Sequence, residues 1–98
     1  MKQNWQPISV AEAKRLIAER DPLLIDIRDK ATFAAEAIPG AHHGSNETIQ
    51  SLLVEIDPAK PIIVYCYHGN SSQLAADFIA AQGFTEVYSL SGGYAAWM

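Results

Sequence analysis

Cys66 is the only cysteine in this chain of 98 residues, and it lies where a buried strand is predicted to end. The residues that follow it are Tyr67, His68, Gly69, Asn70, Ser71 and Ser72. Gly69 and Asn70 are the types that most easily adopt a positive φ, so the loop can curl and turn its backbone N–H groups inward. A helix beginning at Ser71 or Ser72 would add its unpaired first-turn donors and the positive end of its dipole. Such a setting lowers the pKa of a thiol from about 8.5 to roughly 3.5–7.5, which makes it nucleophilic at neutral pH.

Other interpretations of this segment compete with the reactive thiol. A lone cysteine at a strand end is often just a small buried hydrophobic residue, but here no large apolar residue follows Tyr67, and the Gly, Asn and Ser residues suit a turn and a helix start. A cysteine phosphatase would carry an arginine six positions after Cys66 to grip the phosphoryl oxygens, and Ser72 stands there instead. A serine nucleophile would have only His68 nearby as a base, so Ser71 and Ser72 are predicted to cap the helix.

Two residues of the loop have open roles at this point. His68 is the one loop side chain that could become cationic near neutral pH and steer an anion, and it could equally be a solvent-facing rim residue. Tyr67 is predicted to be a rim or packing residue.

Asp26 and Arg28 lie at the carboxyl end of another predicted strand and share one face of it. The favoured interpretation is a structural ion pair that braces the loops, with direct substrate contact as the alternative. His42 and His43 are adjacent, so on a strand they point to opposite faces and cannot bind one ion together. A metal site that combines one of them with His68 and Cys66 is disfavoured, and no metal or other cofactor is predicted.

Composition limits the partners of the chain. Lys and Arg number 7 against 11 Asp and Glu, so the net charge is −4 and the pI is about 5.1, which argues against a nucleic-acid or anionic-membrane partner. One cysteine permits neither an intramolecular disulfide nor a multi-cysteine zinc site, which fits a reducing compartment. With no signal-peptide core at the amino terminus and no apolar run of about 18 residues, we expect a cytoplasmic protein. The length predicts one domain over residues 1–98.

The elements that must position these residues alternate along the chain. Apolar runs predict buried strands at 23–27, 61–65 and 86–90, and weaker extended pieces occur at 6–8 and 41–43. Ser9 and Glu12 form a capping-box pattern for a helix that ends near Arg20, because Pro22 disfavours further helix. A short helical turn is predicted over 31–36 and another over 94–98.

Two further helices are predicted in the middle of the chain. The first is capped by Asn46, carries Ile49, Leu52, Leu53 and Ile56, and ends before Pro58. The second begins at Ser71 or Ser72, presents Leu74, Ala75, Phe78 and Ile79 as its apolar face, and ends at Gly83 as a left-handed C-cap. This alternation predicts an α/β fold with a parallel sheet of four or five strands and helices on both faces. Ligands bind at the carboxyl ends of such strands, which points to 26–29, 66–72 and 91–93. Gly92 and Gly93 are expected to permit close backbone approach there.

The segment from Cys66 to Ser72 resembles the active-site loop of the rhodanese family, in particular that of its small single-domain thiosulfate sulfurtransferases of the GlpE type. Two further stretches support the resemblance. Residues 24–29, Phe33 and residues 38–41 are similar to the family's upstream signature, and residues 90–97 are similar to its closing signature. The chain departs from the family pattern at Glu36-Ala37, where Gly-His is usual, and at its end at Met98, where relatives often continue.

The resemblance implies a single rhodanese-like domain and a double-displacement reaction without a cofactor. Cys66 would take the outer sulfur of thiosulfate as a persulfide and pass it to cyanide or to a thiol acceptor, such as that of a small redox protein. Tyr67 to Ser72 would bind the anionic donor, with Asp26 and Arg28 in support. The alternative is a rhodanese-like sulfur-relay or protein-interaction module with little thiosulfate activity.

Overall fold

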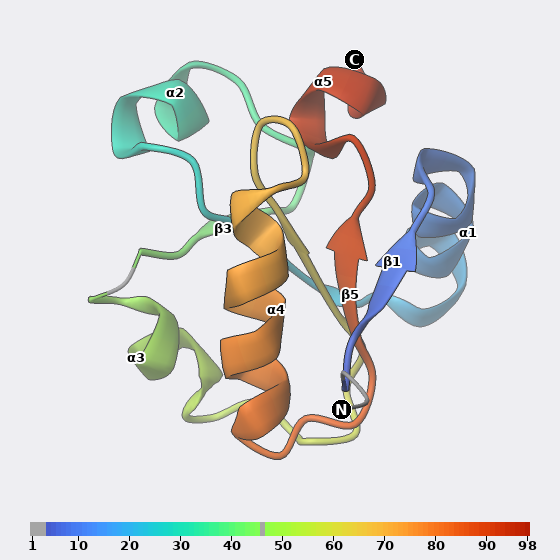
Figure 1. The fold of residues 1–98 in the computed structure, drawn as a ribbon, viewed down its shortest axis with the longest axis vertical. Helices are drawn as coiled ribbons and strands as arrows, with labels where there is room; N and C mark the ends of the chain where they lie inside the picture. Colours follow the sequence, from blue (N-terminus) through green and yellow to red (C-terminus); the bar gives the residue numbers. More distant parts are fainter. Residues whose placement is uncertain (1–3, 46) are drawn as a thin grey trace.

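The computed structural model describes residues 4–45 and 47–98, which form a five-stranded parallel sheet with helices on both faces (Figure 1). The strands are β1 (Gln6–Ile8), β2 (Leu23–Asp26), β3 (His42–His43), β4 (Ile62–Tyr65) and β5 (Val87–Leu90), in the spatial order β1-β5-β4-β2-β3. All neighbouring pairs are parallel. The predicted α/β class is therefore confirmed, including both of the weaker strands. No helix in the described part of the chain is long and apolar enough to cross a membrane.

Burial explains why β2 and β4 can be recognised from their residue types alone. Every residue of these two strands is buried, because helices cover the sheet on both faces. On one face Ile25 and Val64 pack with residues of α3 (Ile49–Leu53) and α4 (Ser71–Ala81). On the other face Leu24 and Ile63 pack with residues of α1 (Val10–Arg20) and α5 (Gly93–Trp97). Two apolar cores therefore hold the central strands in place.

The ends of the first two helices follow local chemistry. Ser9 and Glu12 form the predicted capping box, and α1 ends where Asp21 takes a left-handed conformation with φ of 47°. Asp29 caps α2 (Lys30–Ala35) by accepting from the backbone N–H of Thr32. The short helix predicted over 31–36 is thus present, with its start one residue earlier.

The predictions for α3 are only partly met. The helix ends at Leu53, so Ile56 lies in the turn beyond it, and Thr48 occupies its N-cap position. Asn46, the predicted cap, lies outside the described residues. Gly83 follows α4 with φ of +101°, as predicted for a left-handed helix end.

The apolar face predicted for α4 is wrong in part. Its buried residues are Ser72, Ala76 and Ile79, whereas Leu74 is 75% exposed and Phe78 is 39% exposed. Small side chains at 72 and 76 occupy the face toward β4 and β5. Ile79 belongs to the predicted face and is buried, but the pattern of large apolar residues could not reveal the buried position of Ser72, because a serine is not expected in an apolar stripe.

Gly93 lets α5 begin directly against the loop that follows β4. The backbone N–H of Tyr94 donates to the Cys66 carbonyl at 2.8 Å, and that of Ala95 donates to the Tyr67 carbonyl at 3.0 Å. Gly93 has φ of +62°, and a Cβ there would lie 2.5 Å from each of these carbonyl oxygens. The predicted close backbone approach is confirmed.

We expect Gly93→Ala to destabilise the fold far more than Gly83→Ala. Both glycines have a positive φ, but nothing lies within 4 Å of a Cβ at Gly83. The control variant should therefore lose only the conformational cost of about 1–2 kcal/mol. Gly93→Ala must also displace two backbone carbonyls, which should cost about 2 kcal/mol more. Urea unfolding of both variants measures the difference, and equal losses would contradict the packing described.

Candidate active site

Cys66 directly follows β4, and its side chain lies at the beginning of α4. Its sulfur accepts a hydrogen bond from the backbone N–H of Gly69 at 3.1 Å and another from that of Ser72 at 3.3 Å. The residue is 7% exposed. Because the Ser72 amide belongs to the first turn of α4, the sulfur takes up a donor that the helix itself leaves unpaired. The predicted arrangement of a sulfur held by main-chain amides is present.

The loop from Cys66 to Asn70 curls as predicted, but through one glycine. Gly69 has φ of +92°, whereas Asn70 has φ of −91°, so the positive φ expected of Asn70 is wrong. A Cβ at Gly69 would lie 2.9 Å from the backbone nitrogen of Gly92. Gln73 fastens the loop to the first turn of α4, because its Nε2 donates to the Gly69 carbonyl at 2.9 Å. One residue with a left-handed backbone is enough to turn the loop.

Ser72 faces the sulfur, so the cap predicted for Ser71 and Ser72 is wrong. Asn70 occupies the N-cap position of α4, but its side chain makes no capping hydrogen bond. The Ser72 side chain is fully buried, with its Oγ 3.4 Å from Cys66 Sγ and 2.8 Å from Ser89 Oγ. A serine can only cap a helix from outside its first turn, and this one lies within the turn, on the buried face.

Burial and hydrogen bonding act on the Cys66 thiol in opposite directions. Burial raises its pKa, while hydrogen bonds from the Ser72 hydroxyl and from the backbone N–H groups of Ser72, Gly69 and His68 lower it. The hydrogen bonds prevail, and the pKa of Cys66 lies below the usual value for a cysteine. The site therefore favours the nucleophilic thiolate form.

The remaining loop residues form an exposed rim around this sulfur. Tyr67 is 45% exposed, and its ring meets the His68 ring edge-on with 4.6 Å between the centroids. His68, Asn70 and Ser71 are exposed as well. An incoming molecule would thus meet these polar and aromatic groups before it reaches the sulfur.

Asp26 and Arg28 form the predicted ion pair at the end of β2. Arg28 Nη2 lies 2.7 Å from Asp26 Oδ2, and both side chains are buried. Arg28 also donates to the Glu36 carbonyl at 2.6 Å and stacks 4.1 Å above the centre of the Tyr94 ring. The hydrogen bond to Asp26 is the main reason that the pKa of Arg28 is raised. The pair thus ties β2 to the segment after α2 and to α5, beside the loop.

The two adjacent histidines behave as predicted for opposite strand faces. His42 is exposed, whereas His43 is half-buried, and its Nε2 lies 2.6 Å from the Arg28 carbonyl oxygen. Among residues 4–45 and 47–98, no three His, Cys, Asp or Glu side chains converge on a point where they could hold a metal ion.

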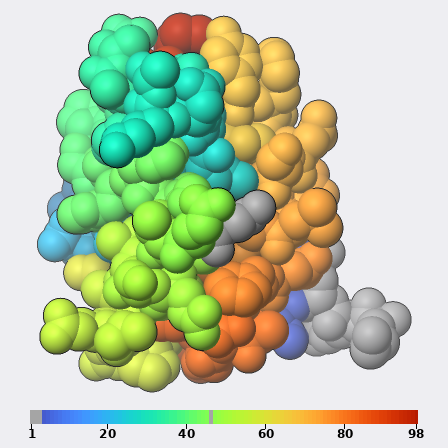
Figure 2. Space-filling view, turned by 90° about the vertical axis from the view of Figure 1, so that its left-hand side faces the viewer, coloured from blue at the N-terminus to red at the C-terminus, as the bar shows by residue number. Residues whose placement is uncertain are grey.

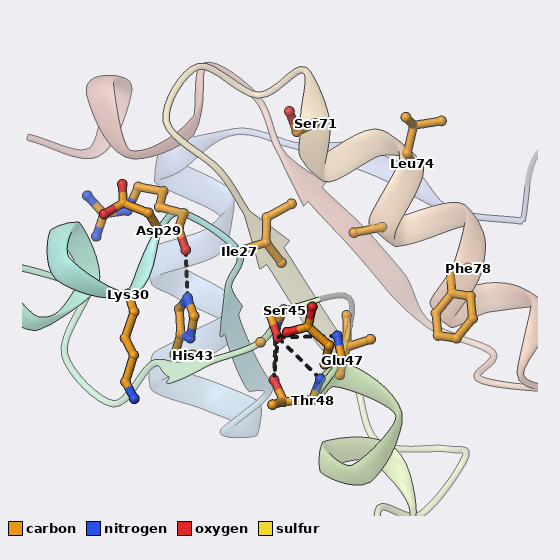
Figure 3. A pocket seen from close by; sticks show the side chains of 14 residues that line it. Ile27, Asp29, Lys30, His43, Ser45, Glu47, Thr48, Ser71, Leu74 and Phe78 are labelled. Carbon is orange, nitrogen blue, oxygen red and sulfur yellow. Dashed lines mark hydrogen bonds between the residues drawn. The ribbon is translucent and has the colours of Figure 1, made fainter.

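The helices α2, α3 and α4 come together on one face of the molecule (Figure 2). An open groove of about 1040 Å³ lies between them, beside the loop (Figure 3). Ser71 lines it at the end nearest the loop, and Leu74 and Phe78 line it along α4. Cys66 is not among the lining residues. The groove therefore lies beside the loop and does not extend over the sulfur.

Sequence reasoning missed Ser89, which contacts Ser72 from β5. The signal was a polar residue inside an otherwise apolar strand, next to Leu90 and two residues after Val87. Ser89 is 3% exposed and pairs in register with Val64, two residues before Cys66. A buried hydroxyl at this position needs a hydrogen-bonding partner, and that partner is Ser72 beside the sulfur.

Comparison with known proteins agrees with this geometry. A family model described as "Rhodanese-like domain" matches residues 9–98. The chain belongs to the rhodanese family. Among the proteins similar to this rhodanese are those named thiosulfate sulfurtransferase GlpE. That of Pseudomonas fluorescens is 45% identical over 86 residues, which cover 88% of this chain and 79% of the relative. That of Pseudoalteromonas translucida is 43% identical over 93 residues, which cover 95% of this chain and 89% of the relative.

The rhodanese fold is also found in solved structures. A rhodanese-like domain protein from Staphylococcus aureus superposes with a TM-score of 0.81 at 24% identity, covering 95% of this chain and 91% of its own. A rhodanese-related protein from Thermoplasma volcanium gives a TM-score of 0.79 at 21% identity. The superposition covers 94% of this chain and 89% of the other. At these identities the likeness concerns the fold.

We expect Cys66 to be alkylated by iodoacetamide with a pH midpoint below about 8.5, the ordinary pKa of a cysteine. The rate follows the thiolate fraction, which the hydrogen bonds from Gly69 and Ser72 increase. The measurement is the alkylation rate between pH 5 and 10 followed by mass spectrometry, with the urea-unfolded protein as control. A midpoint equal to that of the unfolded chain would contradict the proposed electrostatics.

We expect Asp26→Asn to cost about 3 kcal/mol or more of unfolding free energy, because it leaves the buried Arg28 charge without a counter-ion. Arg20→Gln is the control: it removes the exposed Arg20–Glu86 pair and should cost less than about 1 kcal/mol. Urea unfolding measures both. A small loss for Asp26→Asn would show that the pair does not brace the site.

Proposed function

We propose that this protein is a thiosulfate sulfurtransferase with Cys66 as its nucleophile. The observation that carries the proposal is the Cys66 sulfur held by the Gly69 and Ser72 amides at the beginning of α4. The names of the relatives support thiosulfate as the donor. Thiosulfate is a small anion, and loop amides and a helix terminus can bind one despite the net charge of −4.

The first half-reaction is a displacement at sulfur. The Cys66 thiolate attacks the outer sulfur of thiosulfate, and a sulfur–sulfur bond forms to Cys66 while the bond to the inner sulfur breaks. Sulfite leaves with the bonding electron pair, and the enzyme keeps a persulfide anion. Charge balances without proton transfer, so the reaction needs no general acid.

The second half-reaction regenerates the thiolate. An acceptor thiolate or cyanide attacks the terminal sulfur of the persulfide, and Cys66 leaves as the thiolate that the amides already stabilise. Donors placed around a sulfur anion also stabilise the negative charge that spreads over the transition state. The bound donor would be surrounded by the loop residues Tyr67, His68, Gly69, Asn70, Ser71 and Ser72. Asp26 and Arg28 would hold the end of the neighbouring strand.

The exposed rim supports a thiol acceptor presented by another protein. Tyr67 and His68 are accessible, and the open groove lined by Leu74 and Phe78 lies next to the loop. A small redox protein has the required thiol. We also infer a cytoplasmic location, since a reducing compartment keeps the single cysteine available.

Intact-protein mass spectrometry after incubation with thiosulfate tests this function. We expect the mass to rise by one sulfur atom, with one equivalent of sulfite released, because the persulfide is the product of the first half-reaction. Cys66→Ala is the control and should gain nothing. Addition of cyanide should then remove the sulfur as thiocyanate.

A different outcome would favour the alternative function. If Cys66 is alkylated readily but takes no sulfur from thiosulfate, the chain is a relay or interaction module that receives sulfur from another protein.

A further inference from the structure

Two serine hydroxyls lead from the buried sulfur into the sheet. Ser72 Oγ lies 3.4 Å from Cys66 Sγ, and Ser89 Oγ lies 2.8 Å from Ser72 Oγ. Ser72 is fully buried, and Ser89 is 3% exposed. The reaction described above uses no group on β5, so the role of the Ser89 hydroxyl is open.

We propose that Ser89 is a positioning residue for sulfur transfer: its hydroxyl donates to Ser72 Oγ and thereby directs the Ser72 hydroxyl hydrogen to the sulfur anion of Cys66. This inference rests on the proposed function, because a role in sulfur transfer requires that Cys66 carries out that transfer. Ser89 does not touch the sulfur, so it acts only through Ser72.

The hydroxyl hydrogens can be accounted for in both ionisation states. When Cys66 is a thiol, its S–H donates to Ser72 Oγ, and the Ser72 hydrogen points to Ser89. The Ser89 hydrogen then has no acceptor, since Ser72 is its only hydrogen-bonding partner in residues 4–45 and 47–98. When Cys66 is a thiolate, Ser89 donates to Ser72 and Ser72 donates to the sulfur. Every hydrogen is then used, so the buried chain favours the anion.

The fold holds the two serines in this arrangement. Ser89 lies on β5 opposite Val64, which shares a strand face with Cys66 two residues further along. Ser72 lies on the buried face of α4, which packs against β4 and β5. Neither side chain is a capping or surface group, and among the residues that the structure describes their hydroxyls contact each other and the sulfur.

Other ionisable groups near the sulfur do not replace this contact. Tyr67 and His68 are on the loop itself and point into the exposed rim, and Tyr94 contributes its backbone from α5. On the neighbouring strand β2, Asp26 and Arg28 are paired with each other. In the described part of the chain, Ser72 supplies the one side-chain hydrogen bond to Sγ.

The test is the Cys66 alkylation midpoint in Ser89 variants of the full chain. We expect Ser89→Ala to raise the pKa of Cys66 by about 0.5, because the Ser72 hydroxyl then loses the donated hydrogen bond that polarises it and strengthens its own bond to the sulfur anion. Ser89→Thr keeps a hydroxyl and should restore the wild-type midpoint. Circular dichroism and urea unfolding confirm that each variant is folded.

A double-mutant cycle separates positioning from a merely structural effect. In the Ser72→Ala background, Ser89→Ala should leave the Cys66 midpoint unchanged, because the connection is already broken. An unchanged midpoint in the single variant, or an equal shift in both backgrounds, would overturn the proposal. Alkylation needs no thiosulfate, so this test does not depend on the proposed donor reaction. If that reaction fails, no persulfide forms on Cys66, but the alkylation midpoint still shifts in Ser89→Ala.

Discussion

The stabilisation of one sulfur by the amides of Gly69 and Ser72 is the interaction on which this site depends. Burial alone would raise the pKa of Cys66 and leave an inert thiol. The surrounding hydrogen bonds reverse that effect, and they act only if the loop amides face inward. The rest of the molecule can be understood as the means of keeping them so.

The helix α5 holds the carbonyl groups at the start of the loop. Its first backbone N–H groups, from Tyr94 and Ala95, bind the carbonyls of Cys66 and Tyr67. With the carbonyls fixed on that side, the N–H groups further along the loop are free to face the sulfur. Gly93 permits this approach, and the buried Asp26–Arg28 pair holds the end of β2 beside it. Backbone groups on both sides of the loop are therefore hydrogen-bonded, which favours a single loop conformation.

Local patterns in the sequence were sufficient to predict the strands, the capping box of α1 and the sulfur at the start of α4. They failed where the packing of a helix on the sheet determines which side chains are buried. Leu74 and Phe78 are large apolar residues of α4 that remain exposed, whereas the helix buries Ser72 and Ala76 together with Ile79. Ser89 could not be connected to the site, since its contact with Ser72 depends on how α4 lies on β5.

The most direct test follows the amide protons themselves. Nitrogen–proton correlation spectra of labelled protein, recorded across the ionisation of Cys66, report the hydrogen bonds of Gly69 and Ser72 residue by residue. The account predicts large shifts of these two amide protons with one common midpoint, absent in Cys66→Ala and absent at the remote amide of Gly83. Amide protons of Gly69 and Ser72 that move no more than that of Gly83 would contradict it.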